Sequence, residues 1–316
     1  MGKRLIIHQP TNHYGKRFRY YNIFFDKLID EISKDNDVVV DRYYKNSHRG
    51  QSNIKLDWDE TDSDFTIQTY ECEMIIEDYD TKETKILSIS DDLTSTSLNL
   101  QSNPNVTEIY ICQFIRDKIY SHVQEQNWNK YSPWIYFPSN EYDIEHYFNL
   151  RKNTSQFIDK MYFRGDIKSR PILEHFTPDV FYGGNSIGGF DRYASEMINY
   201  SIALSVAGRG ELCYRDIECM GMGVPFIRFE YLSELKTPLI PNYHYISVER
   251  PNDFKDPFNL DRNGIEIHSK MITDRFLQVK DDKEFLSFIS KNSREYYENY
   301  LSPSSSIKYT RELLKL

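Results

Sequence analysis

The chain has 316 residues, of which 39% are hydrophobic and 15% aromatic, so it can fill the cores of two folded domains of ordinary size. A net charge of −9 at pH 7 argues against a nucleic acid or an anionic membrane surface as the main partner, because the overall field repels both. The apolar stretch after the basic start is too short for a signal peptide or a membrane anchor, and no later stretch is long enough to span a bilayer.

The first half of the chain has the pattern of an α/β sheet. A strand, a helix with apolar residues at helical spacing and a second strand make a β-α-β opening. Two later segments alternate like strands and are joined by turn-forming residues, which predicts a hairpin. The expected elements are a helix at residues 17–33 and strands at residues 5–8, 38–40, 65–76, 84–89, 106–114 and 134–137.

The second half begins with a polar, helical segment at residues 143–157, which we interpret as the passage between two lobes. After it the strand and helix rhythm restarts, and this alternation predicts a parallel sheet. We therefore place an N-terminal lobe at residues 1–150 and a C-terminal lobe at residues 151–290. The expected elements are strands at residues 158–163, 180–182, 200–206, 225–229 and 243–248, and helices at residues 169–175, 193–199, 281–300 and 305–316.

The most informative segment spans residues 207–229. The apolar strand before it runs into Gly208, Arg209 and Gly210, which let the backbone turn sharply into a helix start. Free amide groups and the positive end of the helix dipole favour a phosphate at such a start. Arg215 and Glu218 follow three residues apart and project together, and these groups suit a diphosphate and the two hydroxyls of a ribose. The simpler alternative is a solvated Arg/Glu pair beside a glycine turn.

This arrangement resembles the donor-binding segment of GT-B glycosyltransferases, in particular the exostosin-like and protein O-glucosyltransferase-like group. That segment runs strand, loop, R-x-x-E-x-x-x-x-G-x-P-V/F-I, strand. Arg215, Glu218, Gly223, Pro225 and Ile227 stand at those places, and the likeness covers about thirty residues. It implies a GT-B-type α/β fold, with two Rossmann-like lobes facing across a cleft and the nucleotide sugar on the C-terminal lobe. It also implies that the C-terminal helices at residues 291–316 pack back on the N-terminal lobe.

The activity that the resemblance implies is transfer of a hexosyl or pentosyl group from a nucleoside-diphosphate sugar to a glycan or other hydroxyl acceptor. No metal ion and no cofactor beyond this co-substrate is expected. Animal exostosin relatives carry a membrane anchor that this sequence lacks, so we expect a microbial or viral enzyme in the cytoplasm, which is the host cytoplasm if it is viral. The sequence leaves open the sugar, the nucleotide, the acceptor, inversion or retention, and the oligomeric state.

The donor diphosphate needs cationic partners, since the leaving group gains charge as the glycosidic bond breaks. A loop that follows a predicted strand carries two arginines, at the carboxyl edge of the sheet where ligands of open α/β folds bind. This loop is similar to the "RG…R" loop of the same group of enzymes. The expected donor-binding residues are Arg164, Arg170, Gly208, Arg209, Gly210, Arg215 and Glu218.

An inverting transferase also needs a base that takes the acceptor proton. Asp91 and Asp92 end a buried strand of the first lobe, where they would face the cleft. Adjacent side chains point apart, so at most one of the two is expected to serve. His13, in the loop after the first strand, is the second candidate, although an isolated loop histidine is more often only solvated.

Two alternatives stay open. Asp78 and Asp80 form a DxD, the manganese-binding signature of GT-A glycosyltransferases, but they lie on a predicted hairpin tip in an acid-rich chain. The other alternative is a two-lobed protein that binds a glycan or nucleotide without turnover, for which a weak catalytic-base signal would be the symptom. No HExxH, GxSxG or cysteine/histidine metal cluster is present, and the four cysteines show no metal spacing.

Overall fold

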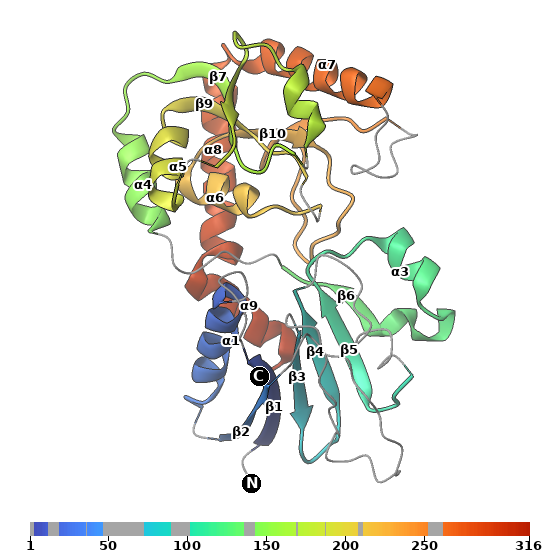
Figure 1. Cartoon of the computed structure of the whole chain (residues 1–316). Helices are drawn as coiled ribbons and strands as arrows, with labels where there is room; N and C mark the ends of the chain where they lie inside the picture. The colour runs from blue at the N-terminus through green and yellow to red at the C-terminus, as the bar shows by residue number, and fades with distance from the viewer. Residues whose placement is uncertain are drawn as a thin grey trace. The chain divides into compact units, whose positions relative to one another are not determined.

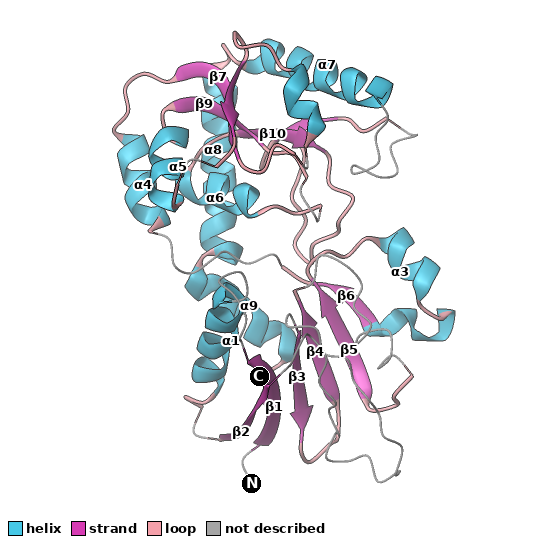
Figure 2. Ribbon diagram, in the orientation of Figure 1, coloured by secondary structure: helices cyan, strands magenta, loops and turns pink. Residues whose placement is uncertain are grey.

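The computed structural model describes residues 3–11, 19–35, 37–46, 73–89, 102–135, 143–168, 170–186, 188–207, 211–251 and 262–316. The chain forms two compact units (Figure 1). Unit 1 contains Met1–Asn140, Ser233–Thr237 and Pro303–Leu316, and unit 2 contains Glu141–Leu232 and Pro238–Ser302. Each unit combines its own sheet with helices (Figure 2), so the α/β class expected from the sequence is confirmed.

Unit 1 is built on a six-stranded mixed sheet with the order β2-β1-β3-β4-β5-β6. β1 pairs in parallel with β2, and β3 runs antiparallel to both β1 and β4, which confirms a hairpin at the predicted place. β4, β5 and β6 are parallel, and β6 lies just before the strand predicted at residues 134–137. The elements are β1 (Lys3–Thr11), α1 (Arg19–Ile32), β2 (Val38–Asn46), β3 (Glu73–Asp78), β4 (Thr84–Ser88), β5 (Val106–Ile111), α3 (Arg116–His122), η1 (Glu125–Lys130), β6 (Tyr131–Pro133) and α9 (Pro303–Leu314).

The C-terminal helix α9 is part of the unit 1 core. It packs beside α1 (Figure 1). The apolar face of α1 buries Phe24 and Leu28 completely. The Phe24 ring meets the fully buried Trp134 edge-on, with ring centroids 6.0 Å apart. The indole Nε1 of Trp134 donates a hydrogen bond to Thr310 Oγ1 of α9 at 3.2 Å. Buried indoles need such a partner, so this bond fixes the chain end on the core.

Unit 2 has a five-stranded parallel sheet with the order β11-β10-β9-β7-β8. When β7 to β11 are numbered 1 to 5 and the sheet is read from β8 to β11, the order is 2-1-3-4-5, which is that of flavodoxin-like folds. The strand order reverses between β7 and β9. The elements are α4 (Ile144–Lys152), β7 (Ile158–Arg164), η2 (Pro171–His175), β8 (Phe181–Gly184), α5 (Phe190–Met197), β9 (Tyr200–Leu204), α6 (Tyr214–Met222), β10 (Phe226–Phe229), β11 (Ile246–Val248), α7 (Arg262–Val279), α8 (Lys283–Tyr296) and the π-helical turn η3 (Tyr297–Leu301).

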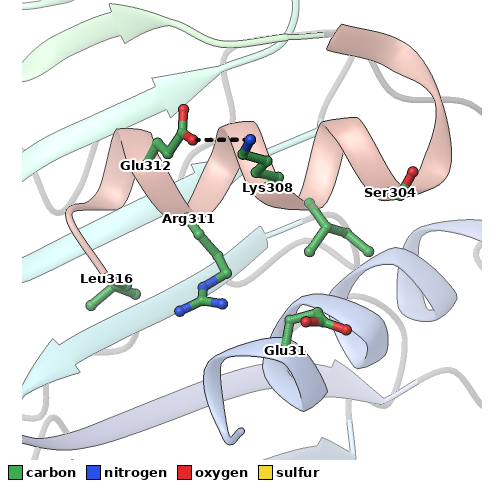
Figure 3. A pocket seen from close by; sticks show the side chains of 7 residues that line it. Glu31, Ser304, Lys308, Arg311, Glu312 and Leu316 are labelled. Atoms are coloured by element: carbon green, nitrogen blue, oxygen red, sulfur yellow. Dashed lines mark ion pairs between the residues drawn. The ribbon is translucent and has the colours of Figure 1, made fainter. Parts of the chain in front are cut away.

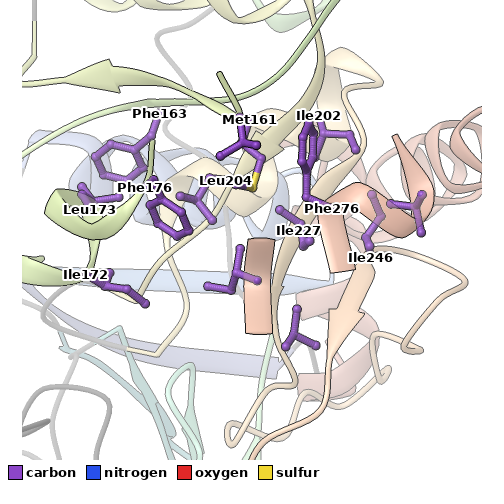
Figure 4. Packing of buried hydrophobic residues seen from close by; sticks show 14 of the residues in the cluster. Met161, Phe163, Ile172, Leu173, Phe176, Ile202, Leu204, Ile227, Ile246 and Phe276 are labelled. Atoms are coloured by element: carbon purple, nitrogen blue, oxygen red, sulfur yellow. The ribbon is translucent and has the colours of Figure 1, made fainter. Parts of the chain in front are cut away.

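The strands of unit 2 are apolar on both faces, as expected for a parallel sheet covered by helices. All five residues of β9 are buried. On one face, Phe163, Leu204 and Ile227 from three neighbouring strands pack with Phe276 of α7 (Figure 4). α5 packs on β7 and β9, and α4 and α8 contact α6.

The helix α7 was not predicted from the sequence. It buries Ile265, Ile272 and Phe276 at helical spacing, but Ile267 and Leu277 lie outside this buried face and are each 48% exposed. These two exposed apolar residues blur the amphipathic pattern on which a sequence prediction depends. In the described part of the chain, no helix combines the length and the apolar character needed to cross a membrane.

The end of α6 packs so closely against its neighbours that it requires glycine at Gly221. A Cβ atom built there would lie 2.6 Å from Ile144 Cγ2 and 3.0 Å from the ring of Tyr297. The helix then stops at Gly223, which adopts the left-handed conformation with φ 66°. Gly221 therefore sets the distance of α6 from α4 and η3.

In Gly221→Ala the added methyl overpacks the contact with Ile144, which should cost about 1–3 kcal/mol. Alanine is the better helix former by roughly 1 kcal/mol, so we expect a net destabilisation of up to about 2 kcal/mol. Urea unfolding followed by circular dichroism measures the change. The matched control is Gly189→Ala at the start of α5, where an added Cβ has no neighbour within 4 Å. An unchanged unfolding midpoint for Gly221→Ala would show that α6 is not held this closely.

Candidate functional site

The candidate site lies at the carboxyl ends of β7 and β9. These two parallel strands are neighbours, and the strand order of the sheet reverses between them. Ligands of open α/β sheets bind outside the carboxyl ends of the strands at such a reversal, because the connections leave the sheet there in opposite directions. β7 ends at Arg164, and the chain after β9 leads into α6, which carries Arg215 and Glu218.

Arg215 reaches from α6 to the end of β7. Its guanidinium lies over the ring of Phe163, 3.9 Å from the centroid, and its Nη2 donates to the main-chain oxygen of Arg164. Its Nε is buried and has no hydrogen-bond partner among the described residues. Burial by itself lowers the pKa of Arg215, but Tyr193, Cys213 and Glu218 outweigh it and raise the pKa, so the guanidinium is charged.

Glu218 lies about one turn after Arg215 on α6 and is partly buried. Burial raises the pKa of its carboxyl to about 7, although the nearby Arg215 and a hydrogen bond from Tyr193 oppose this shift. A carboxyl with such a pKa is poorly hydrated and lies beside a cation. It is therefore suited to bind hydroxyl groups of a ligand, and perturbed carboxyls of this kind often mark functional sites.

Two of the other predicted arginines, Arg164 and Arg170, lie close to this pair. Arg164 Nε forms an ion pair with Glu196 at 3.2 Å, and its Nη2 donates to the hydroxyl of Tyr182 at 3.1 Å. Arg170 donates to main-chain oxygens, from Nε to Val206 at 3.3 Å and from Nη1 to Asp166 at 3.0 Å. The ion pair partly neutralises Arg164, so Arg164 is a weaker partner for a phosphate than the sequence suggested.

The start of α6 differs from the sequence prediction. The helix begins at Tyr214 and not directly after the glycines, and Cys213 is its N-cap. Asp216 reaches back so that its Oδ2 accepts the N–H of Cys213 at 3.2 Å. A carboxylate in the first turn already meets the positive end of the helix dipole. The countercharge for a bound phosphate would therefore come from arginine side chains and not from this helix start.

Behind the site lies a buried charge network that the sequence analysis did not identify. Arg228 of β10 contacts Asp216 at 2.5 Å and Glu211 at 2.9 Å, and all three side chains are at most 2% exposed. Arg250 also pairs with Glu211. The available signal was an arginine within the otherwise apolar strand at residues 225–229, since a charge placed there must find a buried partner.

Several predicted site residues lie outside the described residues, namely His13, Asp91, Asp92, Gly208, Arg209 and Gly210.

Asp78 lies at the end of β3, where its Oδ1 accepts the N–H groups of Asp80 and Thr81 at 3.1 Å each. This bonding is that of a turn cap. Asp80 is exposed. Among the described residues, no group of three or more histidines, cysteines, aspartates or glutamates could hold a metal ion.

No known protein-family profile matches the sequence, and no curated protein matches it either. A comparison with solved structures finds similarity to HepE from Anabaena in complex with UDP-glucose, with 12% identity, coverage of 71% of this chain and 69% of that chain, and a TM-score of 0.40. The comparison also finds WaaG, a glycosyltransferase involved in lipopolysaccharide biosynthesis, with 9% identity, coverage of 96% of this chain and 99% of that chain, and a TM-score of 0.44. TarM has 10% identity, and the match covers 92% of this chain and 57% of that chain with a TM-score of 0.38.

We expect Glu218→Gln to change how stability depends on pH. Since the carboxyl has a pKa of about 7 when folded and an ordinary value of 4.5, the folded state keeps a proton that the unfolded chain releases. The parent should therefore lose stability relative to the variant as pH rises from 4.5 to 7, by about 1–3 kcal/mol. Urea unfolding of both proteins at pH 4.5 and pH 8 measures the difference. Glu295→Gln, at an exposed glutamate of α8, should follow the parent at both pH values. If the difference in unfolding free energy between the parent and Glu218→Gln were the same at both pH values, the carboxyl would be ordinarily hydrated in the folded protein.

Proposed function

We propose that the protein is a glycosyltransferase that moves a hexosyl or pentosyl group from a nucleoside-diphosphate sugar to a hydroxyl of a glycan or other acceptor. Unit 2 would bind the nucleotide. One observation carries the proposal: a charged arginine and a carboxyl with a raised pKa lie side by side on α6, where the strand order of a parallel sheet reverses.

The chemistry of each group supports this assignment. Arg170 and Arg215 both lie near the ring of Phe163, at 5.5 and 3.9 Å from its centroid, so two guanidinium groups border one place at the edge of the sheet. A diphosphate bound between them would gain negative charge as the glycosidic bond breaks, and the two guanidinium groups would stabilise that charge in partly buried surroundings. The buried Nε of Arg215 supports a bound anion as well, because an unpartnered donor costs about 1–3 kcal/mol that a phosphate oxygen would recover. Glu218 would bind the ribose hydroxyls.

The acceptor side belongs to the same proposal. We infer that unit 1 binds the acceptor, with Asp91 or Asp92 as the base of an inverting reaction and His13 as the second candidate. A GT-B arrangement of the two units and kinship with the exostosin-like group rest on the R-x-x-E-x-x-x-x-G-x-P pattern at residues 215–225. Nucleotide binding without transfer would favour the alternative of a non-catalytic binding protein.

The donor contacts can be tested with Arg215→Ala and Glu218→Ala. Each should weaken binding of a nucleoside diphosphate by about 1.5–3 kcal/mol, the range for hydrogen bonds to charged groups, which is roughly 10- to 150-fold in Kd. Isothermal titration against a panel of nucleoside diphosphates and their sugars, with melting temperatures recorded for each variant, measures the effect. The control is Arg275→Ala on α7, whose guanidinium donates to Asn242. The assignment fails if both site variants bind the preferred nucleotide as the parent does.

Metal independence is a separate prediction. With arginines as the countercharge, sugar transfer should survive EDTA, and the double variant Asp78→Asn/Asp80→Asn should stay active. Asparagine keeps the side-chain oxygen that accepts the turn N–H groups, so this variant should fold. Loss of transfer on chelation that manganese restores, together with an inactive double variant, would favour the GT-A alternative.

A further inference from the structure

Unit 2 contains a cavity of about 850 Å³ that is distinct from the candidate donor site. It includes Asp159 and Ser201, each the second residue of its strand, so it lies at the amino ends of β7 and β9. The donor site lies at the carboxyl ends of the same strands. Other walls come from the end of α4 and the segment after it, the end of α6, and the first turns of α8 with the residues just before them. The volume falls within the range of small-molecule sites, about 300–1,000 Å³.

The charge of the cavity wall is positive although the chain as a whole is acidic. Four basic side chains line it, against two acidic ones. Lys280 pairs with Asp281 at 2.8 Å. The basic residues are Arg151, Lys152, Lys280 and Lys283, and the acidic ones are Asp159 and Asp281. A wall with more basic than acidic groups attracts an anion, most strongly where the site is partly shielded from water.

Two deeply buried polar side chains face this cavity. Ser201 is 5% exposed, and its hydroxyl has no hydrogen-bond partner among the described residues. Arg151 is 7% exposed and donates to the main-chain oxygens of Gly223 at 2.9 Å, Ile198 at 2.7 Å and Tyr200 at 2.8 Å. These partners are neutral, so the positive charge of Arg151 is retained at the cavity. A buried hydroxyl without a partner is unfavourable, and a ligand oxygen would satisfy it.

Part of the wall is apolar and can receive a ring. Phe157 is 38% exposed, and the guanidinium of Arg151 lies 4.2 Å from its centroid. Phe148, Met222 and Leu286 add further apolar surface. Ligand pockets commonly combine such a wall with a few polar groups that fix the orientation of the ligand.

We propose that this cavity binds a small organic anion in which a phosphate is joined to an aromatic or other apolar group. The phosphate would lie towards Arg151, Lys152 and Lys283, with one oxygen accepting the Ser201 hydroxyl. The apolar group would lie against Phe157. The site is on the other edge of the sheet from the donor site, so the proposal stands independently of the glycosyltransferase activity.

A second cavity, of about 560 Å³ between α1 and α9 of unit 1, lacks these features (Figure 3). Its two basic side chains are balanced by Glu31 and Glu312, and Lys308 pairs with Glu312 at 4.0 Å. Arg311 pairs with Asp35. Of these two cavities, the one in unit 2 has the charge that favours an anion.

Phenyl phosphate is a suitable probe, with inorganic phosphate and phenol as its two separate halves. Titration calorimetry of the full chain should show that phenyl phosphate binds at least about tenfold more tightly than either half, since the two contacts then act together. Absence of phenyl phosphate binding at millimolar concentration would overturn the proposal.

Substitutions of residues that line the cavity test whether phenyl phosphate binds there. Lys152→Ala and Lys283→Ala should each weaken phenyl phosphate binding about fivefold, the size of one partly exposed charge pair. The matched control is Lys291→Ala, which is on α8 but outside the cavity. The Arg215→Ala variant should bind phenyl phosphate as the parent does. If this variant no longer bound phenyl phosphate, the probe would be bound in the donor site and the assignment to this cavity would be wrong. Unchanged binding in both lysine variants would also refute the assignment.

Ser201→Ala distinguishes a binding role from a structural one. Because the hydroxyl has no partner in the described part of the chain, its removal should leave the melting temperature unchanged or raise it. The same change should weaken phenyl phosphate binding severalfold. A variant that melts lower and binds normally would show that the hydroxyl serves the fold and not the cavity.

Discussion

The position of the candidate site depends on a buried arginine. Arg228 comes from the middle of β10, and its guanidinium contacts the carboxylates of Asp216 and Glu211, both almost completely buried. Removing these charges from water is costly, and loss of one partner of such a pair typically destabilises a protein by about 3–5 kcal/mol. Asp216 lies in the first turn of α6, so the network ties that turn to the sheet. Arg215 is the residue before Asp216, and its place at the end of β7 follows from this constraint.

The other end of α6 is held by arginines as well. Arg151 donates to the main-chain oxygen of Gly223 at 2.9 Å, and Arg294 donates to that of Gly221. The last carbonyl groups of a helix have no partner within the helix and carry the negative end of its dipole, so cations are favourable there. Charged contacts therefore fix α6 at both ends, and Arg215 and Glu218 lie on a rigid element. Rigid support of this kind is what a precise binding site requires.

Much of the fold could be predicted from the sequence, because the strands of unit 2 are short apolar runs separated by polar segments. The candidate site could be predicted only in part. The spacing of Arg215 and Glu218 indicated that they share a helix face, since residues three apart on a helix are neighbours. The network behind them could not be predicted, because its members lie up to 39 residues apart in the chain and meet through the pairing of β10 with both β9 and β11. Only its contacts in the structure identify Asp216 as the cap of the first turn of α6.

The two edges of the unit 2 sheet also suggest how a chain with a net charge of −9 could bind the anionic ligands that we propose for it. Surface acids repel anions only over the screened range of about 8–10 Å at ordinary ionic strength. Arg215 at one edge and Arg151 at the other donate to main-chain oxygens, which leave their charge in place. Arg164 shows the contrast, since its ion pair with Glu196 cancels part of its charge. Arginines anchored by carbonyl groups are thus fixed in position and still able to attract a phosphate, and this property, more than the overall charge, determines which parts of the surface can bind one.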